Sequence, residues 1–168
     1  QPILVGASMG GSTSLLAVGT GRLHAAAMVM VDIAPRIEPE GSDRIKAFMD
    51  QKPDGFDSLD EVADAIASYQ PQRTRPRNLD GLAKNIWLGS DGKYHWHWDP
   101  RRRNRTWDMS EYRQSLERAA DNLNLPVLLV RGGLSDVLTE EGAQSFLQQC
   151  PHAEYVNVTG AAHMVAGD

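Results

Sequence analysis

The stretch Ile3-Leu4-Val5-Gly6-Ala7-Ser8-Met9-Gly10-Gly11 lies close to the start of the chain. An apolar run leads into a G-x-S-x-G sequence, and a helix-compatible run over 12–18 follows. This order predicts a strand, a sharp turn and a helix, with the Ser8 hydroxyl exposed at the apex of the turn. Side chains at the flanking positions are expected to clash with neighbouring backbone, so Gly6 and Gly10 are interpreted as sterically required. Ser8 is therefore a candidate nucleophile, although an ordinary serine in a glycine-rich turn gives the same pattern.

Two further polar residues follow predicted strands. Residues 126–131 form an apolar run that ends in a glycine turn, and Asp136 comes just after that turn. Residues 154–158 form another predicted strand, followed by His163 among small residues. Ser8, Asp136 and His163 thus each follow the carboxyl end of a strand, which is the edge where ligand crevices form in open parallel sheets. We predict that the three residues lie together.

Strands and helices are predicted to alternate along most of the chain. The expected order is a strand over about 2–6, a helix over 12–20, a strand over about 27–33, a long middle segment, a strand over 126–131, a helix over 139–149 and a strand over 154–158. This alternation predicts a parallel sheet with helices on its faces. Thr139 is the expected N-cap of the last helix.

The middle segment, residues 34–125, is far longer than the dozen or so residues that a crossover between parallel strands needs. Ser58-Leu59-Asp60-Glu61 is a capping box that predicts a helix over 59–69. Ser42 is a candidate cap for an earlier helix over 43–50, and Ser110 for a return helix over 111–122. Residues 85–98 have the pattern of two short strands around an Asp-Gly turn.

Tyr94, Trp96 and Trp98 alternate in the second of these short strands and therefore share one face. With Trp87 they are candidates for an aromatic wall of a substrate pocket. Packing within the inserted segment is the alternative interpretation for each of them.

Two other groups in this segment are interpreted as surface features. His95 and His97 alternate like a metal-binding pair, but no cysteine or carboxylate cluster completes a ligand set, so no metal site is predicted. Arg101-Arg102-Arg103-Asn104-Arg105 is interpreted as a solvated surface rather than a phosphate site.

Composition narrows the class of protein. The chain has 168 residues, 41% of them hydrophobic and 23% charged, which is ordinary for a globular domain. A net charge of −5 argues against nucleic-acid or anionic-membrane partners. No run reaches the ~18 apolar residues of a membrane span. The single cysteine, Cys150, excludes an intrachain disulfide and favours a cytoplasmic location.

The sequence resembles the α/β-hydrolase superfamily, in its capped branch of small esterases, cofactor-free peroxidases and carbon–carbon bond hydrolases. The resemblance covers nearly the whole chain and rests on four segments: the elbow 6–11, the strand 28–33, the acid turn 132–137 and the histidine loop 160–165. It implies a partial α/β-hydrolase fold, with a core of residues 1–35 and 111–168 and a mainly helical lid of residues 36–110. Epoxide hydrolases have a similar layout but carry aspartate at the elbow, where this chain has Ser8.

The resemblance also implies an activity. We expect a serine hydrolase for a small ester, lactone or related carbonyl compound, with Ser8, Asp136 and His163 as the triad, the Met9 backbone N–H as one oxyanion donor, and no cofactor. A perhydrolase or peroxidase, or an epoxide-hydrolase-like enzyme, is the alternative. A non-catalytic binding protein is disfavoured because all three triad candidates are present. Some hydrolases place the acid at the position of Asp32, but Asp136 is favoured here, and Asp32 is expected to bond backbone at its strand end.

Members of this superfamily usually have four strands before the elbow strand, and one loop among them gives the second oxyanion donor. The resemblance thus implies that the chain is a fragment whose expected partner is the N-terminal part of the same domain, with a homo-oligomer as another possibility. The strands that are present are expected to line up in sequence order, which leaves residues 2–6 as an open, apolar edge.

Overall fold

The computed structural model describes residues 1–71, 74–75, 78–99 and 108–165. The chain forms two compact units, Gln1–Asp43 with Trp107–Asp168, and Arg44–Thr106. The arginine-rich stretch 101–105 lies outside the described residues. Each unit has its own cluster of buried apolar side chains. Whether the second unit acts as a lid stays a prediction.

The first unit contains a parallel sheet of four strands in the order β1-β2-β5-β6. The strands are β1 (Ile3–Ala7), β2 (Ala27–Val31), β5 (Val127–Gly132) and β6 (Glu154–Val158). The predicted order of strands is confirmed, and β1 is an edge strand of this sheet. Its side chains Ile3 and Val5 are 65% and 72% exposed, so the edge is open and apolar as expected.

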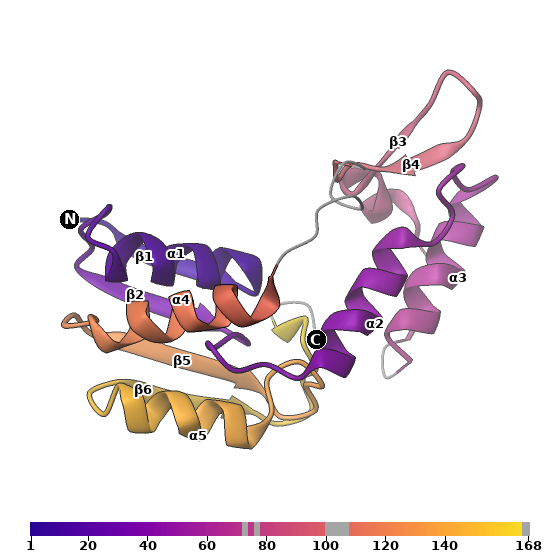
Figure 1. The fold of residues 1–168 in the computed structure, drawn as a ribbon. Coiled ribbons are helices and arrows are strands. Elements are labelled where there is room, and N and C mark those ends of the chain that lie inside the picture. Colours follow the sequence, from indigo (N-terminus) through magenta and orange to yellow (C-terminus); the bar gives the residue numbers. More distant parts are fainter. Residues whose placement is uncertain (72–73, 76–77, 100–107, 166–168) are drawn as a thin grey trace. The chain divides into compact units, whose positions relative to one another are not determined.

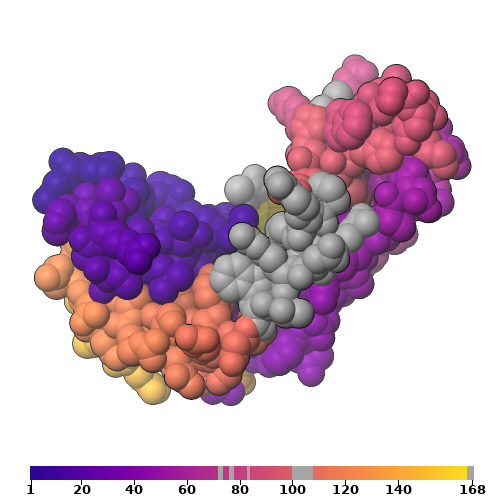
Figure 2. All heavy atoms as spheres, turned by 45° about the horizontal axis from the view of Figure 1, so that its top comes forward, coloured from indigo at the N-terminus to yellow at the C-terminus, as the bar shows by residue number. Residues whose placement is uncertain are grey.

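Three helices lie on the same face of this sheet: α1 (Met9–Gly19), α4 (Met109–Asp121) and α5 (Glu140–Gln149) (Figure 1). Their apolar side chains, including Leu15, Leu116 and Phe146, pack with Met30 and Leu129 of the central strands. Helices α1 and α4 pack together, which the space-filling view shows as indigo against orange (Figure 2). The covered face of the sheet is therefore the core of the unit.

The opposite face of the sheet also carries apolar side chains. The register aligns Val5 with Val29 and Val29 with Leu128, and Val156 continues the face on β6. All four side chains are partly or largely exposed, in contrast to the buried Met30 and its neighbours on the covered face. Strands with apolar side chains on both faces are typical of sheets that are covered on both sides.

Of the two helix caps predicted for the first unit, one is confirmed and the other is wrong. The Thr139 hydroxyl accepts a hydrogen bond from Gly142 N–H at 3.2 Å, so Thr139 is the N-cap of α5 as predicted. The sequence predicts Ser110 as the cap of α4, but the N-cap is Asp108, whose carboxylate accepts from the N–H groups of Ser110 and Glu111. A carboxylate at this position also interacts favourably with the positive end of the helix dipole.

The second unit is built from helices and one small hairpin. Its elements are α2 (Pro39–Asp50), which begins in the first unit, α3 (Leu59–Tyr69), the 3₁₀ helix η1 (Asp80–Lys84), β3 (Ile86–Leu88) and β4 (Tyr94–Trp96). The serine half of the predicted capping box is confirmed, because the Ser58 hydroxyl accepts from Glu61 N–H at 3.2 Å. The Glu61 carboxylate accepts from Asp57 N–H at 2.8 Å, one residue before the N-cap. Ser42 is not a cap: α2 begins three residues earlier, where Pro39 fits the first helical position.

The predicted strand pair is confirmed as an antiparallel hairpin of β3 and β4. Its turn contains Gly92 with φ +78°, a left-handed conformation that glycine adopts without steric cost. Trp96 of β4 is 9% exposed and contacts Phe48, Phe56 and Trp98 through its ring. Aromatic packing thus forms the core of the second unit. No helix in the described part of the chain is long and apolar enough to cross a membrane.

Candidate functional site

Ser8 lies between β1 and α1, at the turn that the G-x-S-x-G sequence predicts. Its backbone has φ +48° and ψ −119°, a conformation that side-chain-bearing residues rarely adopt. The Ser8 N–H donates to Val31 O of the neighbouring strand at 3.0 Å, which holds the turn against the sheet. Its side chain makes no cap bond to α1, so the hydroxyl is available for another partner.

The steric role of the glycines is confirmed at one position and wrong at the other. A Cβ added to Gly6 would lie 2.5 Å from backbone atoms of Gly10 and Gly11, so no side chain fits there. A Cβ on Gly10 would meet none of the described atoms within 4 Å. The second tight position is Gly11, where a Cβ would lie 2.4 Å from the Ile33 side chain. The helix thus approaches the sheet most closely one residue later than expected.

His163 joins the serine to a carboxylate. Its Nε2 lies 3.1 Å from Ser8 Oγ, and its Nδ1 lies 2.7 Å from Asp32 Oδ2. A carboxylate at Nδ1 favours the tautomer with the proton on Nδ1, which leaves Nε2 free to accept the Ser8 proton. The His163 side chain is 8% exposed and the Asp32 side chain is fully buried. All three residues belong to the first unit.

Asp32 has two features that explain its position. It follows β2, which pairs directly with the strand that precedes Ser8, so the two residues leave adjacent strands at the same edge of the sheet. Its backbone also has φ +51°, in the left-handed region that aspartate tolerates better than most residues. The carboxylate accepts from Gly132 N–H at 2.8 Å and from the Ser135 hydroxyl. Asp32 therefore bonds backbone, as expected, and also holds His163.

The expected pairing of Asp136 with His163 is corrected by this geometry. Asp32 occupies the Nδ1 side of the imidazole ring, where the triad acid was expected to be Asp136. Asp136 lies in the loop after β5 and is half-buried, with its carbonyl group packed against Gly41. The two aspartates both follow strands of the same sheet, but β5 is one strand further from Ser8 than β2 is.

The other predicted site residues lie in two places. Met9 is the first residue of α1, so its N–H is one of the four at a helix start that have no partner within the helix. Trp87, Trp96 and Trp98 belong to the second unit. Trp96 is a core residue there and Trp98 stacks on it with ring centroids 4.4 Å apart, whereas Trp87 is 50% exposed.

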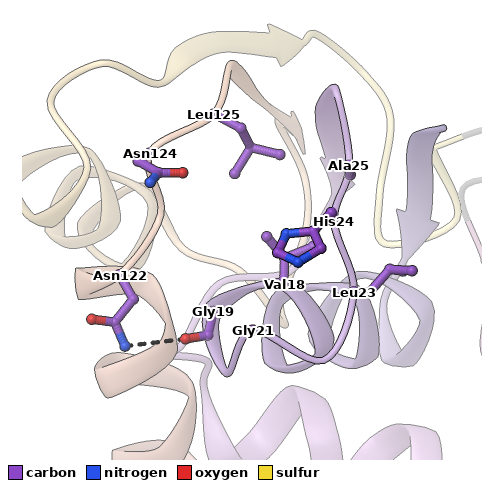
Figure 3. A pocket seen from close by; sticks show the side chains of 9 residues that line it. All are labelled: Val18, Gly19, Gly21, Leu23, His24, Ala25, Asn122, Asn124 and Leu125. Atoms are coloured by element: carbon purple, nitrogen blue, oxygen red, sulfur yellow. Dashed lines mark hydrogen bonds between the residues drawn. The ribbon is translucent and has the colours of Figure 1, made fainter. Parts of the chain in front are cut away.

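Two further features of the described residues are candidates for a binding site, a histidine–aspartate pair and a cavity. In the described ranges, no three His, Cys, Asp or Glu side chains are grouped to hold a metal ion, and His95 bonds Asp91 at 2.9 Å. A cavity of about 240 Å³ lies at the amino ends of the strands, opposite to the carboxyl ends that precede Ser8 and Asp32. Segments 23–25 and 124–125, which lead into β2 and β5, line it (Figure 3). One bond at its wall joins Asn122 Nδ2 to Gly19 O at 3.1 Å. Ser8, Asp32 and His163 take no part in it.

Comparison with known proteins places the chain in a family. The model of the alpha/beta hydrolase family matches residues 1–168, and the chain belongs to this family. A 3-hydroxybutyrate-oligomer hydrolase of Cupriavidus necator is 24% identical over 170 residues, which cover 94% of this chain and 57% of that protein.

Solved structures show the same fold. An E-2-(acetamidomethylene)succinate hydrolase has a TM-score of 0.77 at 23% identity, covering 97% of this chain and 60% of the other. An esterase from Mycobacterium tuberculosis has a TM-score of 0.76 at 23% identity, covering 99% and 57%. The chain thus spans less than two thirds of the length of each of these proteins.

Proposed function

We propose that this chain carries the catalytic residues of a serine hydrolase for a small ester, lactone or related carbonyl compound. The observation that carries the proposal is the continuous series of contacts from Asp32 through His163 to Ser8, at 2.7 and 3.1 Å. A nucleophile within hydrogen-bond reach of a base, with the base oriented by a third group, is the arrangement that activates a serine hydroxyl.

In the first half of the reaction, Ser8 Oγ attacks the substrate carbonyl carbon while its proton passes to His163 Nε2. Asp32 keeps the proton on Nδ1 and stabilises the imidazolium ion that forms. The tetrahedral intermediate then expels the alcohol, which takes the proton from Nε2, and leaves an acyl group on Ser8. The Met9 N–H at the start of α1 is the proposed donor to the oxyanion, since helix N-termini favour negative charge.

In the second half, water attacks the acyl carbon and gives its proton to His163 Nε2. The Ser8–acyl bond breaks, the proton returns to Ser8 Oγ, and the carboxylic acid leaves. The strained backbone of Ser8 supports this role, because residues in rarely populated conformations cluster at active sites.

The names of the relatives support the class of substrate. The curated relative is named for hydrolysing 3-hydroxybutyrate oligomers, and one structural relative is an esterase. At 24% and 23% identity these names favour ester-type carbonyl chemistry but no particular acyl group.

The test uses the full-length protein and an active-site-directed fluorophosphonate. We expect the probe to label Ser8, as located by peptide mass spectrometry, and Ser8→Ala to abolish both labelling and hydrolysis of p-nitrophenyl acetate. Ser110→Ala, which changes an exposed serine of α4, is the matched control and should behave as wild type. Labelling or hydrolysis that persists in Ser8→Ala would place the nucleophile elsewhere.

A further inference from the structure

We infer that Ser135 is a positioning residue that fixes the Asp32 carboxylate for its contact with His163. The inference rests on the proposed function and adds a residue to the site. Ser135 lies in the loop after β5, three residues beyond Gly132, and is 8% exposed. Its hydroxyl donates to Asp32 Oδ2, the same oxygen that lies 2.7 Å from His163 Nδ1.

The direction of the Ser135 hydroxyl is set by its other partners. Its oxygen accepts from the N–H groups of Val137 and Leu138, both at 3.2 Å. A hydroxyl has two acceptor sites and one proton, so two N–H donors leave the proton as the remaining bonding group. That proton is donated to the Asp32 carboxylate.

The loop that carries Ser135 is itself held in place. Arg131, buried at the end of β5, donates from Nε to Leu138 O at 2.8 Å and from a second nitrogen to Asn157 Oδ1 at 3.1 Å. The loop is thus fixed at both ends, by Gly132 N–H on Asp32 Oδ1 and by the Arg131 bond to Leu138.

These contacts give Asp32 a defined orientation. Gly132 holds one carboxylate oxygen, while Ser135 and His163 share the other. Without the Ser135 proton, the Oδ2 side loses one of its two donors and the carboxylate can rotate away from Nδ1. Catalytic groups need support of this kind to stay within about 0.5 Å of their productive geometry.

The first test compares Ser135→Ala with Ser135→Thr, which keeps the hydroxyl. For p-nitrophenyl acetate we expect Ser135→Ala to lower kcat roughly 10- to 100-fold, the rate equivalent of a hydrogen bond to a charged group, with KM nearly unchanged. Ser135→Thr should recover most of kcat. If Ser135→Ala does not fold, Ser135→Cys replaces it, because a thiol of similar shape is a weak donor and should also lower kcat. A wild-type kcat in Ser135→Ala, or in Ser135→Cys where that variant replaces it, would overturn the inference.

The second test is a double-mutant cycle with Asp32→Asn, followed by the rate of fluorophosphonate labelling. If Ser135 acts through the Asp32 carboxylate, Ser135→Ala should slow labelling much less in the Asp32→Asn background than in the wild type. The same fold loss in both backgrounds would assign Ser135 a purely structural role and contradict the inference. An active Ser8→Ala protein would instead contradict the proposed function itself, so the two failures are distinguishable.

Discussion

Nδ1 of His163 lies 2.7 Å from Oδ2 of Asp32, although the two residues are 131 positions apart in the sequence. The contact joins the loop after the last strand of the sheet to the end of β2, and Nε2 of the same ring reaches Ser8 beyond β1. Three segments that follow the carboxyl ends of strands therefore supply one series of hydrogen-bonded side chains, Asp32, His163 and Ser8.

The steric requirement at the turn predicts unequal effects for two glycines of the same motif. Gly6→Ala should strongly lower the melting temperature and the activity, because its Cβ would meet backbone atoms at 2.5 Å. Gly10→Ala should leave the melting temperature unchanged or raise it slightly, since alanine is favoured over glycine by about 1 kcal/mol within helices. Thermal unfolding of both variants is the measurement, and equal destabilisation would contradict the close approach at Gly6.

Part of this site can be predicted from the sequence. The apolar run before Gly6 and the small residues after it predict the turn at Ser8, and the loop position of His163 follows from the strand before it. The choice between Asp32 and Asp136 is beyond a sequence pattern, because both residues follow strands of the same sheet. The predicted strand order already places the strand before Asp32 beside β1, but the left-handed backbone of Asp32 and its contact with His163 are defined only by the folded chain.

The fold, like the site, can be predicted from the sequence only in part. Alternating strands and helices predict the parallel sheet, and the strand order is as expected. Ser42 and Ser110 are residue types that cap helices well, but α2 already begins at Pro39, and α4 is capped by Asp108. Several residues near a helix start can each act as a cap, so the sequence alone leaves that choice open.

The apolar edge and face at β1 predict self-association of residues 1–168. Val5 is 72% exposed on the edge strand, and such edges pair readily with other chains. Val5→Lys should shift the chain toward monomer in analytical ultracentrifugation, because charged side chains oppose edge pairing. Thr13→Lys, an exposed change on α1, is the control for added charge. A wild-type chain that is monomeric at high concentration would contradict the prediction.

Trp96 and Trp87 are predicted to differ in what their replacement by alanine changes, the stability of the second unit or the binding of substrate. Trp96→Ala should destabilise the second unit by about 3–5 kcal/mol, as deletion of a buried aromatic ring does. Trp87→Ala should cost far less because that side chain is 50% exposed. Denaturant unfolding measures both. If Trp87 lines a substrate pocket, Trp87→Ala should raise KM without a change in stability. An unchanged KM would exclude Trp87 from the substrate pocket.

Cys150 is predicted to be unreactive in the folded protein. Burial, together with the charge of Asp121, raises the pKa of its thiol to about 11, and its Sγ–H donates to Ala120 O. The thiol stays protonated in the folded state where an unfolded chain has begun to ionise, so this group lowers stability as the pH rises from about 9 to about 11. Reaction with a disulfide reagent at pH 8 should be slow until denaturant is added. Rapid reaction of the native protein would contradict the buried position.

The assignment of the triad acid is tested most directly by the kcat/KM of Asp32→Asn and Asp136→Asn, measured side by side on p-nitrophenyl acetate. Asp32→Asn should lower kcat/KM by about 10⁴, the cost of the wrong histidine tautomer in a serine protease, while both variants keep their folded structure by circular dichroism. Asp136→Asn should cost far less. The reverse order, with Asp136→Asn inactive and Asp32→Asn close to wild type, would contradict the assignment of Asp32.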